Sequence, residues 1–195
     1  PSLAGAITAL NGATITDPVI ITLTGNETAP TGGYSITASG TAANTITIQG
    51  SASTITAPTP QVSGTLNDAI FKIIGGDYIS ISGFTMQENA SNTTTAAATN
   101  NMTEFGVALF YASTTNGCQN VTISNNIISL NRTYTNTFGI YANSTHSATS
   151  MTTSATATGT GGGNHNLAIT GNSISNVNQG IVVVGPTAAT DQNTG

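Results

Sequence analysis

The sequence predicts an all-β protein, a right-handed parallel β-helix (solenoid), from three observations. One strand motif, in which apolar and small residues alternate before a Gly or Asn, recurs five times. The distance between successive motif starts grows from 25 to 33, 42 and 46 residues (21→46→79→121→167). Shorter apolar segments follow the later copies in a fixed order. A constant motif with growing gaps indicates one repeating unit that carries loop insertions.

The alternation within each motif is typical of a strand with one buried face. Equivalent positions of stacked coils should therefore form continuous inward ladders, because a one-residue slip would bury hydroxyls and expose every isoleucine. The first expected ladder is Ile21, Ile46, Ile79, Val121 and Leu167. The second is Leu23, Ile48, Ile81, Ile123 and Ile169.

Two further strand types accompany the later copies. One recurs as Gly106–Leu109, Gly139–Ala142 and Gly180–Val183, and the other as segments 84–86, 127–130 and 173–175. Three short strands per coil describe a parallel β-helix. A β-sandwich, in which consecutive strands pair around tight hairpins, is the alternative.

We expect a single domain over residues 1–195, as part of a longer protein. Within residues 1–12, apolar side chains fall at helical spacing before Asn11-Gly12, which predicts a short helix that caps the open end of the solenoid. Segments 87–104 and 144–164 are low-complexity insertions.

The third strand type should also present an apolar strip on its outer face. By alternation this strip contains Ala108, Phe110, Tyr141, Val182 and Val184. Such a strip needs a cover. The insertion 144–164 is either that cover or a mobile loop, and self-association through the strip is the other way to cover it.

Composition excludes several function classes. Only 5% of the residues are charged, the net charge is −5, and Lys72 and Arg132 are the only two basic residues. Nucleic acid is therefore not an expected partner, because its phosphates require basic side chains. The sequence has no apolar run of about 18 residues, so we expect no membrane insertion.

Candidate catalytic residues are few. Glu88 and Glu104 stand at the two ends of one insertion and could form a carboxyl pair of the kind that glycosidases use. Arg132 could form a salt bridge with either glutamate or remain solvated. Asp68 and Asp77 occupy turn positions, where aspartate commonly caps backbone amides.

Other reactive side chains lie apart in the sequence. His146 and His165 flank the second insertion without a cluster of further ligands, and Cys118 lies in a turn without a neighbouring histidine. We therefore expect no catalytic residues, no metal site and no cofactor.

The segments NVTISNNIIS, FGIYANS, NLAITGNSIS and QGIVVVG resemble right-handed β-helix proteins of the pectate-lyase-like superfamily. The opening AITALNG, TDPVIITLTG and TAANTITIQG is more narrowly similar to surface or secreted repeat proteins of Bacteroidota that use type 9 secretion sorting. The resemblance covers nearly the whole chain. It implies the β-helix fold and an extracellular or cell-surface location.

The expected function is that of a non-catalytic structural or adhesive module (a stalk, adhesin or matrix component), with glycans or neighbouring surface proteins as partners. The alternative is a polysaccharide-binding or polysaccharide-degrading β-helix protein, with Tyr134 and Tyr141 as exposed aromatic contacts for sugars. Ice binding is a third hypothesis, because the first strand type should present outward rows of hydroxyls. The first row is Thr22, Thr47, Ser80 and Thr122, the second is Thr24, Ser82, Ser124 and Thr170, and Gln49 and Ala168 interrupt the array.

Overall fold

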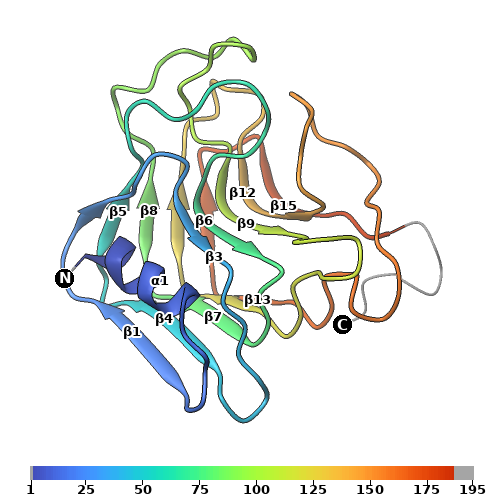
Figure 1. Cartoon of the computed structure of the whole chain (residues 1–195). Helices are drawn as coiled ribbons and strands as arrows, with labels where there is room; N and C mark the ends of the chain where they lie inside the picture. Colours follow the sequence, from blue (N-terminus) through green and yellow to red (C-terminus); the bar gives the residue numbers. More distant parts are fainter. Residues whose placement is uncertain (1, 187–195) are drawn as a thin grey trace.

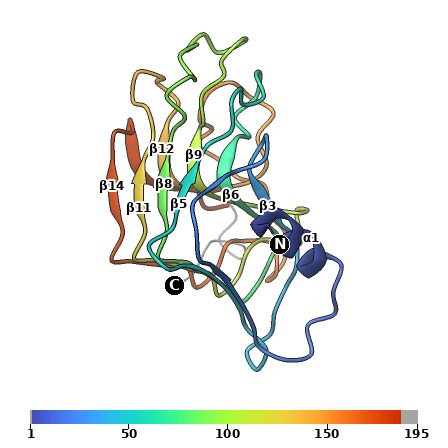
Figure 2. The same ribbon diagram turned by 90° about the vertical axis from the view of Figure 1, so that its left-hand side faces the viewer.

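The protein is a right-handed parallel β-helix in a computed structural model that describes residues 2–186 (Figure 1). Its three sheets each contain five strands, and every pair of neighbouring strands is parallel. Each coil contributes one strand to each sheet, so the strands of one sheet lie side by side along the solenoid axis (Figure 2). The parallel pairing excludes the β-sandwich.

Sheet A consists of the recurring motif of the sequence. Its strands are β1 (Val19–Leu23), β4 (Ile46–Gly50), β7 (Ile79–Ser82), β10 (Thr122–Ser124) and β13 (Ala168–Thr170). Sheet B contains β2 (Glu27–Thr28), β5 (Thr54–Thr56), β8 (Thr85–Gln87), β11 (Ile127–Ser129) and β14 (Ser173–Ser175). Sheet C contains β3 (Tyr34–Ile36), β6 (Ala69–Ile74), β9 (Phe105–Phe110), β12 (Phe138–Asn143) and β15 (Gln179–Val183).

The register predicted for sheet A is confirmed between β4 and β7, where Ile46 aligns with Ile79 and Ile48 with Ile81. It continues from Ile81 through Ile123 to Ile169.

The prediction is wrong in the first coil. There Val19 aligns with Ile46, Ile21 with Ile48, and Leu23 with Gly50. A shift of two residues keeps the alternation of inward and outward side chains, so the apolar pattern alone does not distinguish the two registers. Val19 belongs to the strand although the motif omits it.

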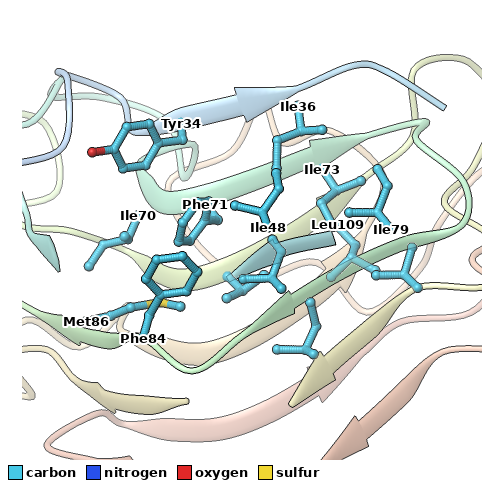
Figure 3. Packing of buried hydrophobic residues seen from close by; sticks show 14 of the residues in the cluster. Tyr34, Ile36, Ile48, Ile70, Phe71, Ile73, Ile79, Phe84, Met86 and Leu109 are labelled. Carbon is cyan, nitrogen blue, oxygen red and sulfur yellow. The ribbon is translucent and has the colours of Figure 1, made fainter. Parts of the chain in front are cut away.

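The core lies between the three sheets and is filled by stacked side chains. Tyr34, Phe71 and Phe84 form a row of aromatic rings with 5.2 Å between successive centroids (Figure 3). Aromatic pairs at this separation contribute roughly 0.5–1.5 kcal/mol beyond their burial. Ile46, Ile48, Ile79 and related side chains fill the rest of the interior.

The capping helix is α1 (Leu3–Asn11), as predicted, and it lies at the β1 end of the solenoid (Figure 2). Leu3, Ile7 and Leu10 are its buried residues. Glu27 from β2 accepts the Leu3 backbone N–H at the helix N-terminus, where unpaired amides favour a carboxylate. At the other end, Asn11 bonds to the backbone of Ser35 and Thr37.

Amide side chains stack in the turn between sheets A and B. Asn126 donates to the backbone oxygen of Ile81, and Asn172 donates to that of Ile123. The Asn172 side chain also accepts from the Asn126 backbone, which links two successive coils. These bonds satisfy the backbone groups that the turn removes from the ladders.

The outer face of sheet C is covered, and the insertion 144–164 is the cover. Met151 packs with Phe110 and Tyr141, while Ala155 and Ala157 pack with Tyr111 and Val184. Backbone bonds fasten it, from Leu66 to Ala148 and from Thr158 to Thr114. This is the orange loop beside β12 and β15 in Figure 1.

Of the two alternatives that the sequence left open for this insertion, a cover and a mobile loop, the structure shows the cover. Ala108, Phe110 and Tyr141 of the strip are buried. The expectation that the chain is part of a longer protein concerns residues outside the described range.

Candidate functional site

Glu88 and Glu104, the two acidic residues of the insertion 87–104, share one corner with Asp68, where the chain enters sheet C. Asp68 and Glu104 immediately precede β6 and β9, and the Glu104 backbone N–H donates to the backbone oxygen of Asp68 at 3.0 Å. Glu88 accepts from the Thr103 backbone N–H at 2.7 Å. Glu88 is thus tied to the residue next to Glu104, and the two ends of the insertion share this corner, as the sequence suggested.

Two of the three carboxyl groups in this corner are closed to solvent, and that of Glu88 is half-buried. Asp68 is 3% exposed and Glu104 is 0% exposed. Burial, followed by the charge of Asp68, raises the pKa of Glu104 to about 9, although backbone amides of Asp68 and Asn67 oppose this shift. Glu104 therefore keeps its proton at neutral pH.

Lys72 supplies a positive charge close to the carboxyl groups of this corner. It projects from β6 and donates to the Asn67 backbone oxygen at 3.1 Å. Burial raises the pKa of Asp68 to about 7, while the positive charge of Lys72 acts in the opposite direction. Of the two glutamates that the sequence suggested as a carboxyl pair, Glu104 is thus closed to solvent, while Glu88 is half-buried.

Arg132 is exposed, whereas both glutamates take backbone amides as partners. Of the two alternatives that the sequence left open, a salt bridge to one of these glutamates and a solvated side chain, Arg132 takes the solvated one. Asp77 fits its expected capping role, since its Oδ1 accepts from the Gln119 backbone N–H at 2.8 Å.

The two tyrosines expected to be exposed sugar contacts are buried, so that prediction is wrong. Tyr134 is 1% exposed and Tyr141 is 0% exposed. Tyr141 stacks on Phe105 with 4.7 Å between centroids, beneath the insertion 144–164. Alternation placed Tyr141 on the outer face correctly, but the loop that covers this face removes it from solvent.

The remaining reactive side chains are part of the structure's interior or its loops. The Cys118 thiol bonds to the backbone oxygens of Ile73 and Phe110, and burial raises its pKa to about 12. A thiol in this state is a poor nucleophile. His146 is buried against the Tyr141 hydroxyl, while His165 is half-buried. Among residues 2–186, no three His, Cys, Asp or Glu side chains are placed to hold a metal ion.

The outer faces of sheets A and B differ from that of sheet C, because their outward side chains are exposed or half-exposed. On sheet A the first row is Ile20, Thr47, Ser80, Thr122 and Ala168, and the second is Thr22, Gln49, Ser82, Ser124 and Thr170. Gln49 donates to the Thr22 hydroxyl at 3.1 Å. These rows form a neutral lattice of hydroxyl and amide groups, one coil apart.

The hydroxyl rows are less regular than the sequence suggested. Because the register of β1 is shifted, Ile20 ends the first row with 67% of its surface exposed, and Thr22 moves to the second row. Gln49 and Ala168 interrupt the rows further. A regular hydroxyl array, which the ice-binding hypothesis needs, is therefore absent from sheet A.

Comparison with protein families, with curated proteins and with solved structures found no match. Within residues 2–186, no helix has the length and hydrophobicity needed to cross a membrane.

Proposed function

We propose that this chain is a non-catalytic adhesive module of a secreted or cell-surface protein, and that the outer face of sheet A is its contact surface. One observation carries the proposal. The solenoid covers the apolar outer face of sheet C with its own loop, yet leaves a neutral polar lattice uncovered on sheet A.

The chemistry of this lattice favours a neutral partner. Hydroxyl and amide groups donate and accept hydrogen bonds without charge, and the rows contain no ionisable side chain. Parallel strands hold such groups about 4.8 Å apart along the axis. A partner with repeating polar groups, such as an extended glycan, can therefore contact several coils at once, and weak contacts add along its length.

A polysaccharide-degrading enzyme is the weaker candidate. The carboxyl groups of Asp68 and Glu104 are buried, and that of Glu104 accepts from the backbone amides of Asn67 and Asp68. General acid–base chemistry would require a substrate within hydrogen-bond reach of these groups.

The test measures depletion of the protein by suspended particles of cellulose, chitin and starch, together with any release of reducing sugars. The double variant Ser82→Lys/Ser124→Lys places two long charged side chains on the central coils of sheet A. We expect particle binding without sugar release, and about a tenfold loss of affinity in this variant.

The matched control is Thr153→Lys/Ser154→Lys, which adds the same charges to exposed positions of the insertion 144–164. It should bind like the parent chain. Sugar release by the purified protein would contradict the proposal, as would equal binding by the two double variants.

A further inference from the structure

The turn that leads into sheet A contains an unusual tyrosine. Tyr78, Asn120 and Asn166 stand one residue before the ladder residues Ile79, Val121 and Leu167, and their φ angles are 54°, 55° and 53°. Asparagine tolerates this left-handed backbone conformation well, whereas a bulky residue adopts it only at a cost. The third coil thus places an aromatic ring where the next two coils use asparagine.

The stacking of this turn is direct. The Tyr78 backbone N–H donates to the backbone oxygen of Gln119, and the Asn120 backbone N–H donates to that of His165, each at 2.9 Å. The Asn166 side chain donates to the Asn120 side-chain oxygen at 3.1 Å. Tyr78 therefore belongs to a polar ladder along the edge of sheet A, and the residue is half-buried.

Tyr78 is one of the residues that line a shallow hollow of about 170 Å³ on the outer surface. The other lining residues are the polar Thr45, Thr47, Ser80, Asn120 and Thr122, and the apolar Ile46 and Ile79. Pockets for enclosed small molecules measure roughly 300–1,000 Å³. The smaller hollow suits one ring of a chain that continues across the surface.

The lining fits a neutral sugar. A pyranose ring has a C–H face that packs on an aromatic side chain, and hydroxyl groups around its edge that pair with hydroxyls and amides. No charged side chain lines the hollow, so a carboxylated sugar finds no cation there. Asp77, the nearest acid in sequence, is already bonded to the Gln119 backbone.

We propose that a neutral polysaccharide binds along sheet A with one sugar ring packed on Tyr78 and hydrogen-bonded within this hollow. This inference rests on the proposed function and names the partner class and one subsite of that contact surface. The rows of hydroxyls that cross β4, β7 and β10 continue from the hollow along the axis.

The experiment compares the parent chain with Tyr78→Asn and Tyr78→Phe by isothermal titration. The probes are cellohexaose, chitohexaose and maltohexaose, with hexagalacturonate as the acidic probe. Tyr78→Asn installs the residue that the next two coils use at this turn, so we expect a folded protein with an unchanged or higher melting temperature. It should lose about five- to tenfold in affinity for the neutral probe that binds, as expected for one aromatic contact.

Tyr78→Phe keeps the ring and should stay within about twofold of the parent affinity, since the aromatic face carries this contact. Equal affinity of the parent and Tyr78→Asn would overturn the subsite while leaving the adhesive function intact. Preference for hexagalacturonate, or binding of none of these probes, would overturn the neutral-glycan inference. The particle assay with the sheet A lysine variants judges the adhesive function separately.

Discussion

At the scale of single residues, the fold depends on where side chains are absent as much as on where they pack. Gly106 and Gly139 face the isoleucines of sheet B, and a Cβ at either position would come within 2.6 Å of Ile128 or Ile174. The corresponding Gly180 of the last coil has no neighbour within 4 Å. The same residue type is therefore required in two coils and dispensable in the third.

We predict that Gly139→Ala destabilises the protein by about 1–3 kcal/mol, because the added methyl group overpacks the core against Ile174. Gly180→Ala is the matched control and should change stability by less than about 0.5 kcal/mol. Urea denaturation measures both variants. Equal midpoints for the two would show that the close approach at Gly139 is relieved without cost.

Glu104 should make stability depend on pH. Its pKa is raised in the folded chain, to about 9, above the roughly 4.3 of an unfolded glutamate, so folding binds a proton between these values. This contribution is complete at low pH and is lost as the pH rises towards 9. Asp68 acts in the same direction up to about pH 7, while the lowered pKa of Lys72 acts oppositely at alkaline pH.

We therefore expect Glu104→Gln, which keeps an oxygen for the Asn67 and Asp68 amides, to flatten the decline in unfolding free energy between pH 5 and about pH 9. Chemical denaturation at several pH values measures this slope, with the partly exposed Glu88→Gln as a comparison. A decline that is as steep in Glu104→Gln as in the parent chain would contradict the assignment.

At the scale of elements, the insertion 144–164 acts as the outer half of a second hydrophobic layer. Its apolar residues Met151, Ala155 and Ala157 close over aromatic side chains of sheet C. A composition rich in Ser, Thr and Ala is thus compatible with an ordered cover, because the sheet beneath supplies the large apolar surfaces.

Deleting residues 147–160 should uncover Phe110 and Tyr141 and so promote self-association. Light scattering over a range of concentrations measures this. Shortening the exposed tip 93–99 of the other insertion uncovers no apolar strip and should leave the mass unchanged. If both deletions leave the protein equally monomeric, the cover has no protective role.

At the scale of the whole molecule, the two ends of the solenoid differ. Helix α1 packs on the first coil, whereas the last described coil exposes inward-facing side chains: Ile181 is 51% exposed and Val183 is 48% exposed. In a solenoid each coil is stabilised mainly by its neighbours. The middle coils should therefore be the most stable part of the chain.

Amide hydrogen exchange tests this gradient. We expect the slowest exchange in β7 and β10, which have a paired strand on each side, and the fastest strand exchange in β13 and β15. Uniform protection from β4 to β15 would mean that the coils unfold as one unit, and would contradict the nearest-neighbour description.

The sequence by itself determined the fold class, the capping helix and the register of sheet A from the second coil onward. The physical reason is that these features depend on local alternation of apolar and small residues, which every later coil repeats. The register of the first coil was predicted wrongly, because a two-residue shift preserves that alternation. The strands β2, β3, β5 and β6 were not predicted, because they lack the repeated pattern of the later coils.

The tertiary structure alone decided which surfaces are available. Tyr141 was placed on an outer face by alternation, yet its exposure depended on a loop whose docking no local pattern encodes. The protonation of Glu104 likewise follows from burial among groups from separate coils. The sequence contained a weak signal for the unusual turn at Tyr78, since a tyrosine stands directly before the strand where later copies of the motif have asparagine. Its left-handed backbone and the hollow beside it appear only when the coils are stacked.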